Sequence, residues 1–299
     1  MARDHTASPS RPAADDPVPR WVVVLFGVTA VAITVTLALG STVCATDASA
    51  SCPNWPGCYH GRLTPRAATQ PVVEFVHRVI SASVGVLALA SVVAGARLRH
   101  RNRLLLVLPV VALLGALASG IFGMMTIRWG INRVEAAFDL LAAIISMGAM
   151  WRAWTTARHP GARWVFRRDV VVGLVAVAGL VASHFGAVLV AGTGSLTRCM
   201  GWVMLVRGPG DGPWWGWAAQ QAVGLVGALA AIAATATWWR RHRDTATVCL
   251  AVLIVVEVVV GIVIAVHGAT HLTGTLHAAP ASIILALLMA STMRSAQRV

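Results

Sequence analysis

Apolar residues occupy this chain in long runs that alternate with short polar stretches. A run of roughly 20 apolar residues is long enough to cross a lipid bilayer as a helix. The pattern predicts eight such spans, at 21–43, 72–96, 104–126, 132–151, 170–192, 216–237, 246–266 and 276–293. Residues 1–20 are polar and include Pro and Asp, a composition that predicts a disordered tail. We therefore expect an all-α integral membrane protein.

Composition and charge agree with this class and add an orientation. Only 12% of the residues are charged, whereas a soluble chain carries about 25%. All 24 basic residues are arginines, and 17 of them lie in the two termini and in the loops after the second, fourth and sixth spans. The positive-inside rule then predicts a multi-pass cell-membrane protein with both termini in the cytoplasm. Topology explains the net charge of +13, so we expect no nucleic-acid partner.

The order of spans and loops predicts two similar halves. A charged stretch near 163–169 separates residues 21–162 from residues 163–299, and each part holds four spans. Each half has a long outer loop after its first span, at 44–71 and at 193–215. We interpret this plan as two parallel-repeated four-helix bundles, with cofactor sites between facing helices. Parallel repeats weaken the case for a secondary transporter built from inverted repeats.

Polar side chains gather at one depth, in the outer half of the predicted spans. An ionisable residue inside a membrane costs about 2.5–3.5 kcal/mol on insertion scales, so each one is a candidate functional residue. Taken alone, a histidine here is more simply a satisfied structural residue, and Glu257 a protonated one bonded to a carbonyl. Their common depth predicts a polar cofactor or substrate site instead. The set is Glu74, His77, Asp139, His184, Gln221, Glu257 and His277.

Two motifs near the second span indicate a family. The loop contains Cys52-Pro53-Asn54-Trp55-Pro56-Gly57-Cys58, and the span opens with Glu74-Phe75-Val76-His77-Arg78. This pair of motifs, with the eight spans and the duplicated plan, resembles the haem A synthase family. The sharp motifs lie only within 52–78, although the overall plan covers most of the chain.

The resemblance implies a cofactor and a set of roles. Haem would lie between the even-numbered helices of each half near the outer face, with a haem b cofactor in one half. The other half would take the substrate haem O, whose methyl group becomes the formyl group of haem A. His77 and His277 would bind iron, Glu74 would handle protons and Arg78 would pair with a haem propionate. The resemblance also implies a disulfide between two loop cysteines, Cys52 and Cys58.

The chain departs from the family at two expected histidines. Asp139 stands in the fourth span and Gln220 or Gln221 in the sixth. We therefore expect one axial histidine per half, an open iron position and a substrate other than haem O. The competing interpretation is that His184 or His271 has replaced the missing ligands. The second half also lacks paired cysteines: Cys199 stands alone in its loop, and Cys44 and Cys249 have no evident partner.

Two alternatives remain beside this interpretation of the chain as a haem enzyme. Non-haem iron would suit a mixed set of histidines and carboxylates. That set is Glu74, Asp139, Glu257 and His184, with His77 and His277. The other alternative is a non-catalytic haem-binding or assembly protein of the membrane. In the enzyme interpretations Glu74, Asp139 and Glu257 are the catalytic candidates, and Gln221, His184 and Arg78 line the cofactor. The sequence leaves the electron donor and the substrate open.

Overall fold

The computed structural model describes residues 17–190, 199, 214–241 and 243–298 of the chain. Eight helices in these ranges are long and apolar enough to cross a membrane. They are α1 (Arg20–Ala45), α2 (Thr69–Leu98), α3 (Leu104–Arg128), α4 (Arg133–Arg158), α5 (Arg168–Val190), α6 (Trp214–Arg241), α7 (Thr245–His267) and α8 (His271–Ala296). The predicted class, an all-α multi-pass membrane protein, is therefore confirmed.

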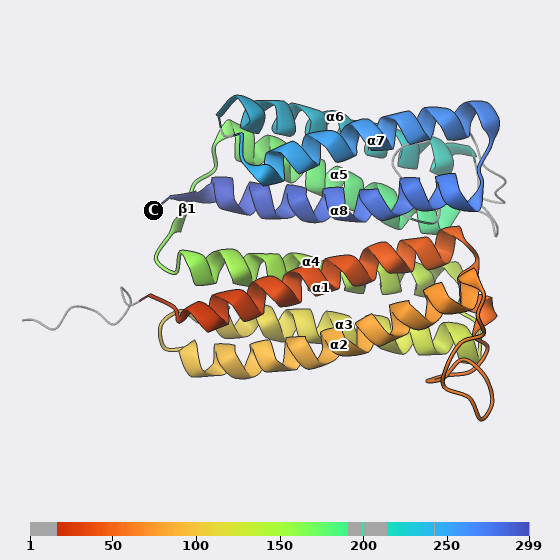
Figure 1. The fold of residues 1–299 in the computed structure, drawn as a ribbon. Helices are drawn as coiled ribbons and strands as arrows, with labels where there is room; N and C mark the ends of the chain where they lie inside the picture. The colour runs from red at the N-terminus through yellow and green to blue at the C-terminus, as the bar shows by residue number, and fades with distance from the viewer. Residues whose placement is uncertain (1–16, 191–198, 200–213, 242, 299) are drawn as a thin grey trace, which may run out of the picture.

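The helices run side by side, with their ends at two faces of the molecule (Figure 1). The loop that joins α1 to α2 lies at one face, which we call the loop end. Both described ends of the chain lie at the other face, with the turns that carry most of the arginines, and we call it the arginine end. The predicted tail lies mostly in residues 1–16, and the second outer loop mostly in residues 191–213, so both are largely outside the described residues.

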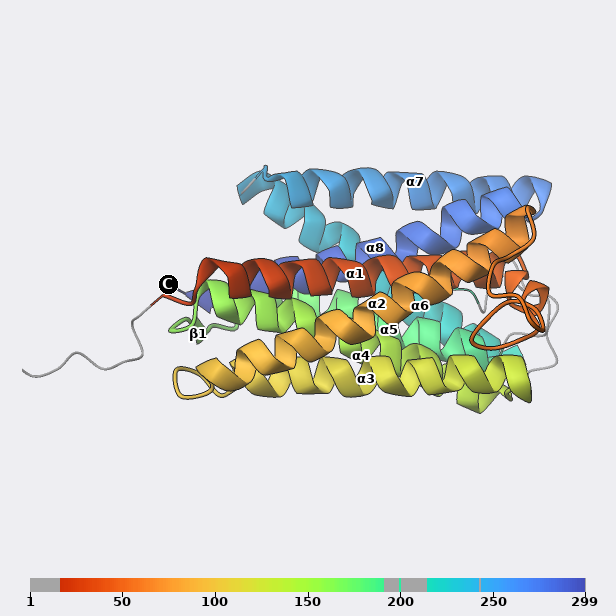
Figure 2. The ribbon, with the colours of Figure 1, turned by 60° about the horizontal axis from the view of Figure 1, so that its bottom comes forward.

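The helices pack as two groups of four, α1–α4 and α5–α8 (Figure 1). Within each group every helix packs on the next, and the last packs on the first. Among the described helices, α2 and α4 lack extensive backbone contact, as do α6 and α8, so each even-numbered pair lies across a diagonal. Figure 2 shows α2 crossing α3 obliquely and α7 at the edge of the molecule. The two groups match the predicted halves, while their duplication stays a prediction.

Local sequence explains where several helices begin. Asn132 caps α4: its side-chain oxygen accepts hydrogen bonds from the backbone N–H groups of Val134 and Glu135. In return the Glu135 carboxylate accepts a hydrogen bond from the backbone N–H of Asn132. Thr270 and Thr273 form the same reciprocal cap at α8. Glu135 thereby satisfies a backbone group that the first turn of the helix leaves open.

Glycines set the closest helix contacts. A Cβ atom added at Gly179 of α5 would lie 2.7 Å from the Cα of Gly227 of α6. A Cβ atom added at Gly115 of α3 would lie 2.7 Å from the carbonyl oxygen of Ala142 of α4. Small residues let helix backbones approach closely, and such contacts stabilise helix pairs inside membranes. Each half therefore contains at least one helix pair that a side chain would force apart.

The halves meet through α1 and α8, which lie next to each other, and through α4, which packs on α5 and α8. Ser41 of α1 and Ser282 of α8 share a hydrogen bond of 3.0 Å between buried hydroxyls. At the arginine end, β1 (Arg163–Trp164) pairs antiparallel with β2 (Gln297–Arg298), so the chain between the halves is tied to the C-terminal segment.

A disulfide between Cys44 and Cys199 also joins the halves at the loop end, with Cα atoms 5.5 Å apart. We expected neither cysteine to have a partner, and that prediction was wrong. The two residues are 155 positions apart, and no local spacing connects them. They meet because α1 ends beside the second half, where residue 199 also lies. Cys249 of α7 is exposed and outside both disulfides.

Candidate cofactor site at the loop end

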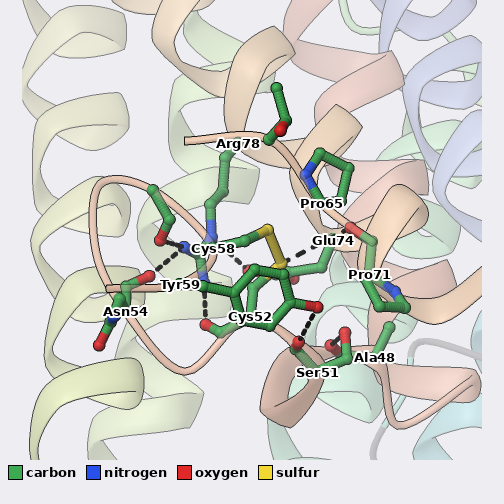
Figure 3. Close-up of a disulfide and its surroundings, with 12 residues drawn as sticks. Ala48, Ser51, Cys52, Asn54, Cys58, Tyr59, Pro65, Pro71, Glu74 and Arg78 are labelled. Atoms are coloured by element: carbon green, nitrogen blue, oxygen red, sulfur yellow. Dashed lines mark hydrogen bonds and ion pairs between the residues drawn. A yellow bond between two sulfur atoms is a disulfide. The ribbon is translucent and has the colours of Figure 1, made fainter. Parts of the chain in front are cut away.

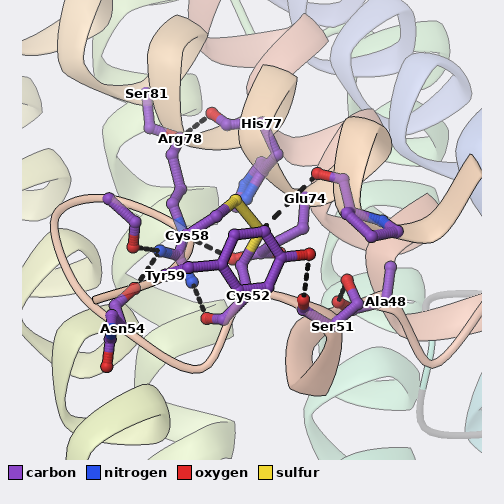
Figure 4. A network of polar contacts seen from close by, with 12 residues as sticks. Ala48, Ser51, Cys52, Asn54, Cys58, Tyr59, Glu74, His77, Arg78 and Ser81 are labelled. Carbon is purple, nitrogen blue, oxygen red and sulfur yellow. Dashed lines mark hydrogen bonds and ion pairs between the residues drawn. A yellow bond between two sulfur atoms is a disulfide. The ribbon is translucent and has the colours of Figure 1, made fainter. Parts of the chain in front are cut away.

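Arg78 of α2 organises the polar site of the first half. Its Nε donates a 2.7 Å hydrogen bond to Oε1 of Glu74, one helical turn earlier. Its two terminal nitrogens donate to three backbone carbonyls of the preceding loop. The acceptors are Asn54, Gly57 and Cys52, at 2.5, 3.0 and 2.8 Å. Figures 3 and 4 show Arg78 with loop carbonyls around its guanidinium group.

The loop presents these carbonyls together because it is closed upon itself. Cys52 and Cys58 form the expected disulfide, with an S–S distance of 2.00 Å (Figure 3). The amide of Asn54 also donates to the carbonyl of Cys58, and Tyr59 donates its hydroxyl to the carbonyl of Ser51. A carbonyl buried without a donor costs free energy, so the guanidinium and the loop stabilise each other. Arg78 therefore anchors the loop to α2.

This arrangement changes what Glu74 and Arg78 can do. Glu74 is 5% exposed, and its charge is compensated by Arg78. Four of the five N–H donors of the guanidinium are engaged, so an anionic group such as a propionate competes with existing bonds. The roles expected for both residues stay predictions, and the observed contacts define a buried ion pair under a disulfide-closed loop.

His77 lies beside this ion pair, on the side that faces α1. The ring is half-buried, and the described residues give neither ring nitrogen a hydrogen bond (Figure 4). A Cβ atom added at Gly40 of α1 would lie 3.3 Å from Nε2 of His77. Because Gly40 has no side chain, the imidazole of His77 has space beside α1. Its Nε2 is directed at this helix, which also contacts the second half.

Asp139 of α4 lies across the diagonal from α2 and has a partner of its own. Ser119 of α3 donates a 2.5 Å hydrogen bond to its Oδ1. The residue before Asp139 contacts α5: the rings of Phe138 and Phe185 meet edge to face, with centroids 6.1 Å apart. Asp139 therefore binds α4 to α3, and the described residues record no bond from it to the α2 pair.

The second half contains a more deeply buried pair. Nδ1 of His277, on α8, lies 3.1 Å from Oε1 of Glu257, on α7, with side chains 3% and 0% exposed. A Cβ atom added at Gly261, one turn after Glu257, would only touch the His277 ring at 3.6 Å, which is an ordinary contact. A neutral imidazole that faces a carboxylate through Nδ1 carries its proton there and keeps a lone pair on Nε2.

Four polar side chains lie buried in the part of α5 and α6 near the loop end, namely Ser183, His184, Gln220 and Gln221. Gln220 donates to the hydroxyl of Ser183 at 3.0 Å, and Gln221 donates to Oε1 of Gln220 at 2.8 Å. Among the described residues, Oε1 of Gln221 and Nε2 of His184 have no hydrogen-bond partner. His184 is 2% exposed. Its helix, α5, packs on α8, which carries His277, and α8 also packs on α7, which carries Glu257.

The expected residues do not form a single group. Among the described residues, no three His, Cys, Asp or Glu side chains lie close enough together to hold a metal ion. The described residues therefore do not bring together a complete ligand set for non-haem iron, and that alternative stays a prediction. Haem needs only one or two axial side chains and apolar surroundings, and the half-buried His77 and the buried His277 and His184 fit that requirement. His271 is exposed at the first turn of α8 and does not.

Sequence reasoning missed one feature of the loop end. A hollow of about 610 Å³ opens between the loop and the end of α3. Its lining includes Trp55, His60, Arg62, Leu63 and Arg128. No spacing in the sequence connects residue 128 with the loop, because only the fold places the end of α3 beside it.

The fold and these residues define a class, a multi-pass membrane protein with buried histidines at one end of two helix bundles. Comparison with known proteins adds no name to that class. The chain matches no protein-family model and no curated protein sequence.

Proposed function

We propose that the protein is a membrane oxidoreductase that resembles haem A synthases and binds haem at its loop end. In this proposal the loop end faces the extracytoplasmic side and both termini lie in the cytoplasm, in line with the 17 arginines in the two termini and in the loops after the second, fourth and sixth spans. His77 binds iron in the first half and His277 in the second. The substrate is a molecule other than haem O, and the electron donor is left open.

One observation carries the proposal, the buried contact between Glu257 and His277. Histidines that bind metals commonly give their other ring nitrogen to a carboxylate, which sets the tautomer and the ring orientation. Here that carboxylate comes from the neighbouring helix, and both side chains are almost fully buried. An ionisable pair at this depth is costly without a function. In the proposal, Nε2 of His277 is the atom that would hold the haem iron.

The protein's own residues have defined tasks in this proposal. Bound haem supplies one-electron transfer and, at an open position, oxygen activation. Glu257 orients the ligand His277, and Gly40 leaves room for the ligand His77. Glu74, paired with the arginine that fastens the loop, is the group that would accept and release protons near the first site. Asp139 and Gln221 stand where the family has histidines, and this supports a site altered for another substrate.

A test begins with the purified protein in detergent. A Soret band, a measured haem content, and loss of haem in His77→Ala and in His277→Ala are expected. The matched control is His60→Ala, because that loop histidine is exposed and lines the open hollow. Absence of haem from the wild type, or full haem content in both ligand variants, contradicts the proposal.

The same preparations test the substrate. Co-expression with a haem O synthase, followed by haem extraction and chromatography, should give no haem A above the empty-vector control. Glu74→Gln should keep the haem and slow turnover once a substrate is identified. Accumulation of haem A would instead assign the chain the unchanged family reaction.

A non-catalytic haem-binding or assembly protein is the second candidate, and the Glu74–Arg78 pair favours it. A carboxylate that is paired with a guanidinium through Oε1 is a poor proton donor. Full haem content with unchanged electron transfer in Glu74→Gln would support this candidate over the enzyme.

A further inference from the structure

The hollow between the α1–α2 loop and the end of α3 has no task in the proposed function. It measures about 610 Å³, a size typical of pockets that bind small molecules. Its walls come from the loop between Pro53 and Leu63 and from the last two residues of α3, Ile127 and Arg128. Because α3 is apolar and long enough to cross a membrane, its end lies at a membrane surface. The hollow therefore opens at the level where lipid headgroups lie.

The charged side chains of the hollow are positive. Arg62 and Arg128 line it, both are exposed, and its lining among the described residues includes no Asp or Glu. Nε and Nη2 of Arg62 donate to the hydroxyl of Thr64 and to the carbonyl of Pro65, at 3.1 and 3.2 Å. These bonds hold the guanidinium in place and use two of its five N–H donors. Paired guanidinium donors match the oxygens of a phosphate, so the hollow fits a phosphate-bearing anion.

An exposed apolar stripe of α3 leads to the hollow. Leu114, Leu117 and Ile121 are each more than half exposed. They precede Arg128 by 14, 11 and 7 residues, close to whole turns of a helix, so all four lie on one face of α3. Trp129, the next residue, is also exposed, as tryptophans at membrane interfaces commonly are. A ligand that matches both features has a phosphate in the hollow and hydrocarbon along the stripe.

We infer that the hollow binds the headgroup of an anionic phospholipid, with its phosphate paired with Arg62 and Arg128 and an acyl chain along the stripe of α3. The C-terminal end of a helix opposes an anion. That opposition is reduced here, because the amides of Trp129 and Gly130 already bond to carbonyls of the last turn. The bound lipid links the loop to α3, as Arg78 links it to α2. Lipid binding here does not require haem, and it stands or falls separately from the proposed function.

The test uses the full chain in detergent and a photoreactive analogue of phosphatidylglycerol. Mass spectrometry of crosslinked peptides should place the label within residues 53–63 or at the end of α3, apart from any label at the arginine end. Unlabelled phosphatidylglycerol should displace it more effectively than phosphatidylcholine with the same chains. Arg128→Ala and Arg62→Ala should each raise the half-maximal labelling concentration at least about tenfold, because each removes a hydrogen bond between charged groups. A wild type without label at the hollow overturns the inference.

Arg66→Ala is the matched control, because that arginine is exposed in the same loop and does not line the hollow. It should raise the concentration by no more than about fivefold, the contribution of one charge near a membrane surface. Equal effects of Arg66→Ala and Arg128→Ala overturn the inference, because surface charge alone then attracts the lipid.

Glycerophosphoglycerol, the same headgroup without acyl chains, separates a lipid from a soluble phosphodiester. It should not displace the label at the concentrations at which phosphatidylglycerol does, because it makes no contact with the stripe of α3. Equal displacement by the two compounds overturns the inference and assigns the hollow to a soluble ligand.

Discussion

The two halves bury a carboxylate beside a histidine at the same end of the molecule, and they compensate its charge differently. In the first half Glu74 pairs with Arg78, which is also bonded to a loop outside the helices. In the second half Glu257 faces His277 inside the helix bundle, and both side chains are almost fully buried. The first site therefore depends on its loop, whereas the second depends on helix packing. Two neighbouring groups of four helices can thus hold sites with different sensitivities.

Removal of the disulfides should produce the largest loss of stability. It should also distinguish the link between the halves from the closed loop of the first half. Cys44→Ala with Cys199→Ala opens a connection over 155 residues, and the chain-entropy relation gives a loss of up to about 5 kcal/mol in the free energy of unfolding. Cys52→Ala with Cys58→Ala opens one over 6 residues, for which the same relation gives about 2 kcal/mol. Unfolding in detergent measures both losses. A larger loss from the short loop would contradict the view that Cys44–Cys199 holds the halves together.

Arg78→Ala should come next, with a loss of about 3–5 kcal/mol, because it leaves a buried carboxylate unpaired and three carbonyls without their donor. Limited proteolysis should then cut within residues 44–71. Arg62→Ala is the control, since that arginine is exposed and its change should stay within about 0.5 kcal/mol. Glu257→Ala should destabilise the protein while the loop stays resistant. Equal cleavage of the loop in both variants would remove the proposed difference between the halves.

Gly179→Ala should cost about 1–3 kcal/mol, because the added methyl group meets the backbone of Gly227 at 2.7 Å. Gly85→Ala is the same change on α2, where nothing lies within 4 Å, and it should be neutral or stabilise by up to about 1 kcal/mol. Thermal unfolding of the two variants measures the contrast. If they melt together, close packing of α5 on α6 is not what holds the second half.

The smallest effect is expected where the halves touch. Ser41→Ala and Ser282→Ala, made singly and together, should give a coupling energy of about 1 kcal/mol for their shared hydrogen bond. Ser83→Ala is the control, because that exposed serine bonds only to the Val79 carbonyl of its own helix. A coupling energy of zero in the double-mutant cycle would show that this contact does not join the halves.

Much of the architecture was predictable because membrane spans are encoded locally. The span predicted at 21–43 corresponds to α1 at Arg20–Ala45, and the span predicted at 246–266 to α7 at Thr245–His267. The span predicted at 132–151 was too short, since α4 continues to Arg158 through residues that are less apolar. Hydropathy detects the part of a helix inside the bilayer, whereas backbone hydrogen bonds continue past it.

The site was predictable only as a set of residues at one depth. Which of them meet depends on helix rotation and on backbone groups that no side-chain pattern reveals. Arg78 is an example, because its partners are mostly carbonyls, and every residue has one. The contact between Glu257 and His277 joins neighbouring helices, and their spacing in the chain does not indicate it. Cys44 and Cys199 were missed for the same reason.

The cysteine pairing also constrains how the chain is made. During synthesis Cys44, Cys52 and Cys58 are all translated long before Cys199, which follows Cys58 by 141 residues in the printed sequence. Cys44 must therefore stay reduced while three further helices of its own half and the whole of α5 are added, although two closer thiols are at hand. Rapid closure of the loop between Cys52 and Cys58 removes these competitors. Oxidation of the local pair before the distant one is then a condition for the halves to be joined correctly.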